Sequence, residues 1–220
     1  MKFVHIADVH LDVPFTTLEG RGLSEKRRLE QREALKDVVE YIKNNNIPYL
    51  FICGDLYEQE YIRESTIDYI NKLFETILDT KIYIIPGNHD PFIKNSYYAK
   101  YNWAKNVKIF NGKIEKIEDK NVCIYGYGFE DFYLKNPEYE KIEIEDTNKI
   151  NILLTHGTVD GNKNEKAELY NPISKTKLKE LGFDYVGIGH IHKISYNDEF
   201  EQKIINPGSL ISLEIGRAHV

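Results

Sequence analysis

The stretch Lys81-Ile-Tyr-Ile-Ile-Pro-Gly-Asn-His-Asp90 joins an apolar segment to a polar cluster. Residues 81–85 have the composition of a buried strand, and the Pro86-Gly87 pair ends that strand and permits a tight turn. Asn88 then offers a neutral carbonyl oxygen, and His89 offers a proton near physiological pH. A turn alone would account for the proline, glycine and asparagine but not for the histidine. The stretch therefore predicts a functional loop at the end of a strand.

Two earlier segments have the same construction. The apolar run 2–7 ends in Asp8-Val-His10, and the apolar run 49–53 opens into Gly54-Asp55. Each of these pairs taken alone is common by chance, so a simple turn or a surface histidine would explain it. Their repetition after successive strands favours a shared site.

The segments between these strands have the periodicity of amphipathic helices. Residues 24–44 carry apolar side chains at i, i+3, i+4 and i+7, with Ser24 as the expected N-cap. A second helix is expected at about residues 63–78, with these apolar side chains facing inward: Ile67, Ile70, Phe74, Ile77 and Leu78. The β-α-β-α-β order predicts an α/β fold with a parallel sheet, whose ligands bind outside the carboxyl ends of the strands.

The second half of the chain is richer in short strands. Turn residues separate the strands expected at 107–110, 114–117, 122–126, 150–154, 185–188 and 204–205. His156 follows the fourth of these, and Gly189-His190-Ile191-His192 follows the fifth. A short helix near residues 174–181 closes at Gly182, a common residue after a helix end.

Five histidines directly follow apolar strands: His10, His89, His156, His190 and His192. A single strand-end histidine is usually a hydrogen-bonded rim residue, but chance gives a poor account of five together. His5 is the exception, because it lies within the first strand, and we interpret it as a packed core histidine. In an extended segment residues i and i+2 point the same way, so the D-x-H and H-x-H pairs each present two side chains on one side.

The predicted metal ligands combine carboxylate, imidazole and amide groups: Asp8, His10, Asp55, Asn88, His156, His190 and His192. The Asp55 carboxylate can bridge two cations, so these ligands make two four-ligand sites. Such a mixed set suits Mn²⁺, Fe²⁺ or Zn²⁺, whereas Ca²⁺ and Mg²⁺ prefer oxygen ligands. Two ions about 3.5–4 Å apart form the arrangement used for in-line displacement at phosphorus.

The composition and charge of the chain limit its domain number, cellular compartment and binding partners. The chain has 220 residues, 41% of them hydrophobic and 29% charged, as expected for one substantial domain. It has no apolar run of about 18 residues, so no membrane span is expected. A signal peptide of about 15–30 residues would remove Asp8 and His10, and the two cysteines lie in separate strand-like segments, so we expect a reducing cytoplasm. The net charge of −6 argues mildly against a nucleic-acid surface, but two bound divalent ions would make the site locally positive.

The last six residues, 215–220, have a different interpretation. Their reverse translation matches the start of a widely used sequencing adapter, so we expect the natural gene to continue past about Glu214. His219 is therefore excluded from the metal ligands. The expected domain is residues 1–214.

In order along the chain, the blocks D-x-H, G-D, G-N-H, H and G-H-x-H resemble the signature of the calcineurin-like metallophosphoesterase superfamily. Within it, the sequence resembles in particular the SbcD-type and YhaO-like DNA repair exonucleases. The residues that carry this second resemblance are His5–Phe15, Gly54–Tyr57, Gly87–Asp90, Gly182–Tyr185 and Asn206–Leu210.

The resemblance implies a four-layer αββα sandwich, a preference for manganese and a role for each block. Asp8, His10 and His192 would hold one metal, the second would be held by Asn88, His156 and His190, and Asp55 would bridge them. His89 would stabilise the charged phosphorus centre or protonate the leaving oxygen. The resemblance also implies a DNA substrate, an SMC-type ATPase partner for the full-length protein and homodimers. The capping and partner-binding regions would lie beyond this chain.

One departure and two alternatives accompany this interpretation. Many nucleases of this type carry Asp or His where this chain has Glu58. The Ser/Thr phosphatases carry G-D-x-x-D-R-G, and the residues Glu58-Gln-Glu60 here do not match it. A phosphodiesterase or phosphatase for small nucleotides or phosphoproteins remains an alternative, as does a non-catalytic interaction scaffold on the same fold.

Overall fold

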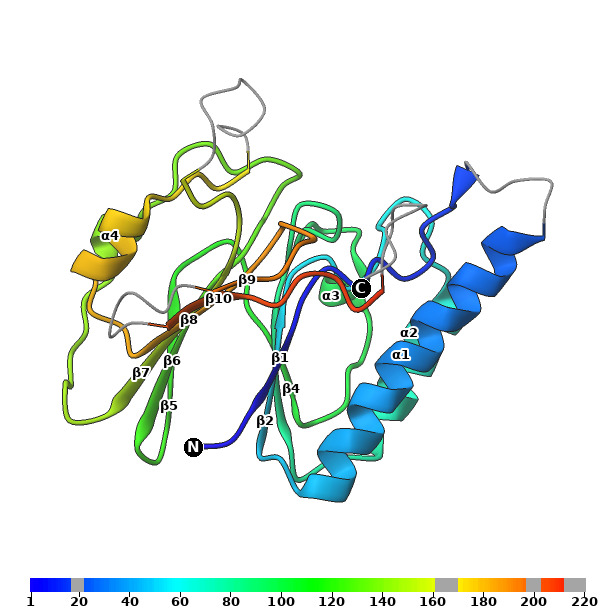
Figure 1. Ribbon diagram of the computed structural model, residues 1–220, viewed down its shortest axis with the longest axis horizontal. Helices are drawn as coiled ribbons and strands as arrows, with labels where there is room; N and C mark the ends of the chain where they lie inside the picture. Colours follow the sequence, from blue (N-terminus) through cyan, green and yellow to red (C-terminus); the bar gives the residue numbers. More distant parts are fainter. Residues whose placement is uncertain (17–21, 161–169, 197–202, 212–220) are drawn as a thin grey trace.

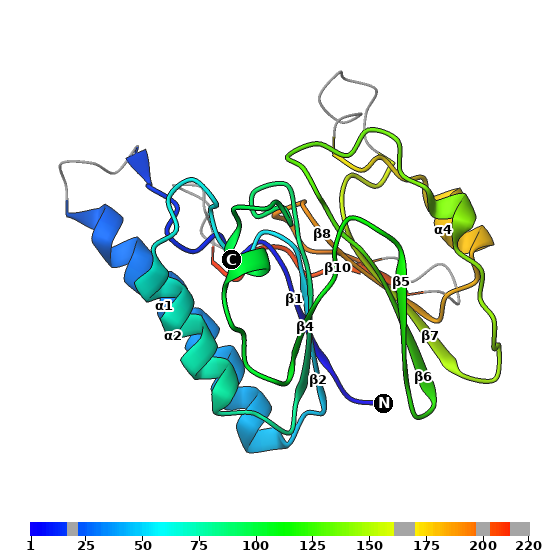
Figure 2. The ribbon, with the colours of Figure 1, turned by 180° about the vertical axis from the view of Figure 1, so that it is seen from behind.

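The computed structural model describes residues 1–16, 22–160, 170–196 and 203–211, so the predicted adapter tail lies outside the described residues. Two β-sheets lie face to face, and helices cover the outer face of each sheet (Figures 1 and 2). This is the four-layer α/β sandwich that the family resemblance implies. In the described parts of the chain, no helix combines the length and apolarity that crossing a membrane requires.

The first sheet has four parallel strands in the order β1-β2-β3-β4. Its elements and the helices connected to them are β1 (Val4–Ile6), α1 (Leu23–Asn45), β2 (Tyr49–Cys53), α2 (Glu64–Glu75), β3 (Lys81–Ile85), α3 (Tyr97–Lys100) and β4 (Val107–Ile109). Ile6 pairs with Ile52, and Cys53 pairs with Ile85. The three strands therefore end at one edge, and the predicted polar clusters follow at that edge.

The second sheet has the order β5-β6-β7-β8-β10-β9. Its elements are β5 (Glu115–Asp119), β6 (Val122–Tyr127), the 3₁₀ helix η2 (Tyr139–Lys141), β7 (Ile150–His156), α4 (Lys175–Glu180), β8 (Tyr185–Gly189), β9 (Ser195–Tyr196) and β10 (Lys203–Asn206). The inner strands pair in parallel, and β5 and β9 pair antiparallel at the two edges. His156 pairs with Gly189, so the loops after β7 and β8 also meet at one edge.

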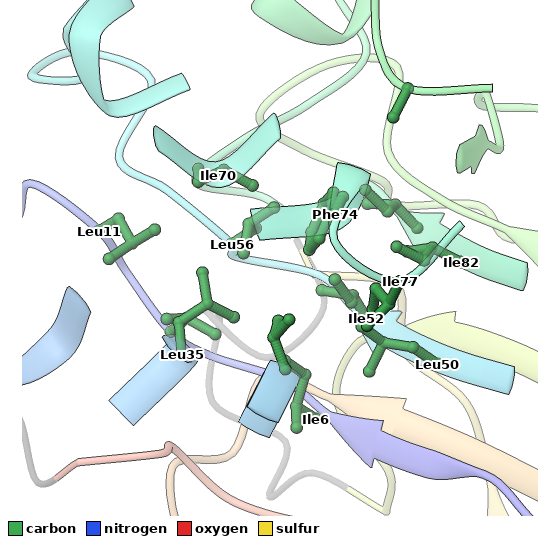
Figure 3. Packing of buried hydrophobic residues seen from close by; sticks show 14 of the residues in the cluster. Ile6, Leu11, Leu35, Leu50, Ile52, Leu56, Ile70, Phe74, Ile77 and Ile82 are labelled. Carbon is green, nitrogen blue, oxygen red and sulfur yellow. The ribbon is translucent and has the colours of Figure 1, made fainter. Parts of the chain in front are cut away.

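Three apolar layers hold the sandwich together. Alternate residues of β2 divide between two of them, because Leu50 and Ile52 pack beneath α1 and α2 (Figure 3), whereas Phe51 and Cys53 pack between the two sheets. A third layer lies between the second sheet and α4, where Leu178 is fully buried. Each fully buried large apolar side chain of this kind contributes about 1.5–3 kcal/mol of transfer free energy.

The structure corrects two local predictions. Helix α1 begins at Leu23, so Gly22, with a φ of 65°, and not Ser24 is the N-cap residue; Ser24 lies in the first turn, and its hydroxyl donates to Phe15 O at 3.3 Å. Helix α2 ends at Glu75, so Leu78 is 44% exposed and does not face inward. The strand expected at 107–110 is confirmed as β4, and the structure places it in the first sheet.

Candidate metal centre

All eight predicted site residues converge at the carboxyl ends of the strands. Among the described residues, three groups of side chains have ligating atoms within 4.8 Å of one another. Two contain only predicted ligands (Asp8, His10 and His192, and Asp55, His156 and His190), and the third combines His10 with Glu58 and His89. Asn88 joins the second group, because its Oδ1 lies 3.1 Å from both His156 Nε2 and His190 Nδ1. His89 lies beside the first group, with its ring centroid 4.8 Å from that of His10. His190 and His192 thus enter different groups, as the family resemblance implies.

Backbone strain and cross-loop hydrogen bonds produce this convergence. Asp8, His10 and Asp55 have φ values of 52°, 50° and 54°, in the left-handed region that non-glycine residues seldom occupy. The extended geometry expected for Asp8-Val-His10 is therefore wrong, although the two side chains do meet. Asp8 N donates to Gly54 O at 3.1 Å, and His10 N donates to Asp55 O at 2.9 Å. These bonds lock the loop after β1 onto the loop after β2.

Two glycines allow the loops to approach closely. Gly54 has a φ of 84°, and a Cβ there would lie 2.1 Å from His156 Nδ1. A Cβ on Gly189 would lie 2.0 Å from Cys53 O. The sequence therefore needs glycine at both positions for the ends of β2, β7 and β8 to meet.

The orientation of His156 shows that these residues fit a cation. Its Nδ1 lies 2.8 Å from Cys53 O, and a carbonyl oxygen can only accept, so Nδ1 carries the hydrogen. When His156 is neutral, the lone pair on Nε2 therefore faces Asp55 Oδ2 at 3.2 Å and Asn88 Oδ1 at 3.1 Å. Three acceptor atoms crowd together, and a positive charge between them removes their repulsion. A carboxylate, an imidazole and an amide oxygen form a donor set suited to Mn²⁺, Fe²⁺ or Zn²⁺.

Burial and mutual charge shift the acid–base properties of the site. Burial raises the pKa of Asp8 to about 6, and the negative charge of Asp55 acts in the same direction. Burial alone lowers the pKa of His156, but the Asp55 and Asp8 carboxylates outweigh it and raise this pKa to about 9. Burial and the neighbouring His156 charge lower the pKa of His190 to about 4. A proton on His156 and a divalent ion would therefore compete for the same nitrogen.

Glu58, which in the sequence stands out only as a departure from the nuclease pattern, contacts two of the predicted site residues. Its two carboxylate oxygens accept from His10 Nδ1 at 2.7 Å and from His89 Nδ1 at 2.9 Å. Burial alone would raise the pKa of Glu58, but these two bonds lower it to about 2. Burial lowers the pKa of His89, but its bond to Glu58 outweighs this effect and raises the pKa to about 9. Its place three residues after Asp55, in the same short loop, is the signal that could have identified it.

Asp90 is a second residue that the sequence did not single out. Its carboxylate accepts from Asp55 N at 3.0 Å, Leu56 N at 2.7 Å and Gly87 N at 2.6 Å. It also accepts from the Tyr98 hydroxyl at 2.6 Å. Asp90 thus ties the loop after β2 to the loop after β3 and fixes the position of Asp55.

His5 lies apart from these groups, as predicted. Its Nδ1 lies 2.9 Å from the Tyr185 hydroxyl, between the two sheets. Its Nε2 is buried and has no hydrogen-bond partner among the described residues. Burial lowers the pKa of His5 to about 3. A neutral, packed histidine fits this position.

Comparison with known proteins gives a family match and several relatives. The calcineurin-like phosphoesterase family, Metallophos, matches residues 1–194. The uncharacterized metallophosphoesterase YhaO of Bacillus subtilis (strain 168) is 24% identical over 221 residues, covering 95% of this chain and 53% of YhaO. The D subunit of the nuclease SbcCD of Staphylococcus epidermidis is 29% identical over 235 residues, covering 91% of this chain and 59% of that protein. The chain thus spans between half and three fifths of these relatives.

Two solved structures share the fold. TT1561 of Thermus thermophilus aligns with a TM-score of 0.56 at 11% identity, covering 94% of this chain and 89% of that one. A dimetal phosphatase from Danio rerio aligns with a TM-score of 0.51 at 11% identity, covering 96% and 88%. At this identity the likeness concerns the fold alone.

Proposed function

Because the chain belongs to the calcineurin-like phosphoesterase family, we propose that it is a two-metal phosphodiesterase that acts on DNA ends. The observation that carries the proposal is the meeting of seven donor side chains from loops as distant in sequence as Asp8 and His192. Asp55 lies between the two groups, since its Oδ2 is 3.6 Å from His10 Nε2 and 3.2 Å from His156 Nε2. This position supports a bridging role.

We assign the donors to two ions. Asp8, His10 and His192 hold one, and Asn88, His156 and His190 hold the other. When bound, two divalent ions supply positive charge at the phosphoryl group and lower the pKa of a coordinated water. Glu58 and the Cys53 carbonyl orient His10 and His156 toward them. The ions are Mn²⁺ by preference, with Fe²⁺ and Zn²⁺ as alternatives.

His89 is the proposed acid. Glu58 keeps it protonated at neutral pH, since the pKa of His89 is raised to about 9. Its side chain is 45% exposed and therefore reachable by substrate, whereas five of the seven donors are buried and only His190 and His192 are partly or fully exposed. It would stabilise charge at phosphorus or protonate the leaving oxygen.

The DNA substrate rests on a relative that is named as part of the nuclease SbcCD. By the same likeness we propose that the whole protein works in DNA repair with an SMC-type ATPase partner. The complete set of donors supports an enzyme rather than a scaffold, because an interaction role requires none of them.

The test compares three substrates in Mn²⁺: single-stranded DNA, bis-p-nitrophenyl phosphate and p-nitrophenyl phosphate. We expect both diesters to be hydrolysed faster than the monoester, with large losses in His89→Ala and Asp55→Asn. His5→Gln is the matched control, because it alters a histidine outside the site. A wild-type protein that cleaves only the monoester, or cleaves no ester with Mn²⁺, Fe²⁺ or Zn²⁺, would contradict the proposal.

A further inference from the structure

A series of aromatic rings leads outward from the metal centre. The Tyr170 ring lies 5.3 Å from that of His190, with an interplanar angle of 38°. The Tyr133 ring lies 5.9 Å from that of Tyr170, at 33°. Tyr133 is 52% exposed, and the neighbouring Phe132 is 37% exposed. The series thus runs from a proposed metal ligand to the surface.

Hydrogen bonds hold the two segments that carry these rings beside the metal centre. Tyr170 forms a bridge with Leu134, so the two segments lie side by side (Figure 1). Asn171 N donates to Leu134 O at 2.7 Å, and Asn171 Nδ2 donates to His156 O at 2.7 Å. The segment that carries Tyr170 is therefore bonded directly to a proposed metal ligand. Tyr133, next to Leu134, is held at a fixed distance from the site.

Core packing does not account for Tyr133. Its hydroxyl has no hydrogen-bond partner among the residues that the structure describes, and half of its surface meets solvent. The adjoining Glu130 and Asp131 are exposed and acidic and Lys135 is exposed and basic, so this loop offers no net positive charge to a phosphate group. An uncharged planar ring can stack on Tyr133 without approaching these carboxylates closely.

We propose that Tyr133, supported by Tyr170, stacks against a nucleobase beside the scissile phosphate. This inference rests on the proposed phosphodiesterase function and narrows its substrate to diesters that carry a base. A base inside a duplex has both faces covered by its neighbours, so the base that stacks here is unpaired or lies at the very end of a strand. The preferred substrate is therefore a single strand or a frayed end.

The test uses two diesters with the same p-nitrophenolate leaving group in Mn²⁺. One is the p-nitrophenyl ester of thymidine 5′-monophosphate, and the other is ethyl p-nitrophenyl phosphate, which lacks a base. Tyr133→Ala should raise KM for the thymidine ester by about 5- to 100-fold and leave the ethyl ester unchanged. Tyr133→Phe should retain wild-type KM, because the ring remains. Tyr41→Ala, at a tyrosine on α1 that is 58% exposed, is the matched control.

A second measurement separates this inference from the proposed function. The affinity of a fluorescent oligothymidylate is measured for wild type and Tyr133→Ala in two separate buffers, one with Mn²⁺ and one with Ca²⁺ in its place to suppress turnover. Weaker binding by the variant supports stacking even if wild type hydrolyses neither ester. That lack of hydrolysis would contradict the phosphodiesterase proposal but not the role of Tyr133. Equal oligonucleotide affinity, or equal changes for both esters, would overturn the role of Tyr133.

Discussion

Glu58 connects the two histidines on which the proposed chemistry depends. One carboxylate oxygen orients His10, a proposed ligand, and the other bonds to His89, the proposed acid. A carboxylate behind a ligating imidazole fixes its tautomer and increases its basicity. A single residue therefore couples metal binding to the protonation of the acid.

Glu58→Gln tests this coupling. The amide oxygen can accept from one histidine, but the NH₂ group then faces the N–H of the other. The pKa of His89 should fall from about 9 toward the ordinary histidine value of about 6.5. Because the acid must be protonated, activity is lost as pH rises through this pKa, so the loss should begin at lower pH in the variant. We also expect kcat to fall by about 10- to 100-fold.

The measurement is the pH profile of kcat in Mn²⁺, with thymidine dinucleotide as a substrate whose alkoxide leaving group needs a proton. Glu60→Gln, at an exposed glutamate nearby, should behave as wild type. A Glu58→Gln profile with an unshifted alkaline limb would contradict the coupling.

His5 makes a different prediction, about stability. Burial lowers the pKa of His5 to about 3 in the folded chain, against about 6.5 when unfolded. The unfolded state therefore binds the proton first, and the contribution of neutral His5 is present above about pH 6.5 and lost as pH falls toward 3. The expected loss is at most about 1.4 kcal/mol per pH unit. Urea unfolding of the metal-free protein between about pH 7.5 and pH 4.5 should show a smaller slope in His5→Gln. Equal slopes of the free energy of unfolding against pH in wild type and His5→Gln would contradict this prediction.

The proposed ligands could be predicted from residue type and position in the sequence. The residues that hold those ligands in place could not. Asp8, Asp55 and Asn88 each follow an apolar strand, so the sheet edge itself brings them together. Glu58 and Asp90 act through hydrogen bonds between loops, and their partners depend on backbone conformations such as the φ of 54° at Asp55. No local pattern encodes those contacts.

At the scale of elements, Asp12 joins the loop after β1 to the start of α2. Its Oδ2 accepts from Arg63 N at 3.3 Å and from Thr66 Oγ1 at 2.6 Å, whereas the N-cap residue Arg63 supplies no side-chain cap of its own. Its Oδ1 lies 3.1 Å from Arg32 Nη2 on α1. One carboxylate thus caps one helix and ties it to another.

Asp12→Ala should lower the free energy of unfolding by about 1–3 kcal/mol, because it removes a helix cap and leaves buried donors unpaired. Urea titration of the metal-free protein measures the change. Asp37→Ala, at an exposed carboxylate of α1, is the control and should stay within about 0.5 kcal/mol of wild type. A change of that small size in Asp12→Ala would show that the cap contributes nothing.

Helical periodicity predicted the existence of α1 and α2 but not their ends. Ser24 is a preferred N-cap type, yet the helix begins at Leu23 and Gly22, with a φ of 65° that glycine adopts readily, precedes it. Leu78 continues the apolar stripe, but α2 ends at Glu75, and the turn that follows carries Leu78 to the surface. The geometry of the adjoining turn determines where a helix begins or ends, and the side-chain types there indicate that geometry only weakly.

At the scale of the whole molecule, the two sheets meet at the proposed metal centre. The loops after β1, β2 and β3 belong to the first sheet, and those after β7 and β8 belong to the second. The β-α-β-α-β pattern predicted the first sheet, whereas the four-layer arrangement came from the family resemblance. Periodicity could not place β4 in the first sheet or β10 beside β8, because non-local pairing decides both.

Divalent ions should stabilise the entire fold, because each proposed ion has ligands from both sheets. His192 joins Asp8 and His10, and Asp55 joins His156 and His190. An ion that binds only the folded chain adds about 2.7 kcal/mol of stability at 100 times its Kd, which raises Tm by about 5–10 °C for a chain of this size. Mn²⁺ should produce this shift and Ca²⁺ a smaller one, each measured against the protein in chelator. Asp55→Asn should lose most of the Mn²⁺ shift relative to its own metal-free Tm, and His5→Gln should keep it. An equal shift in Asp55→Asn would mean that Mn²⁺ binds elsewhere, and the two sheets would then not be joined through these donors.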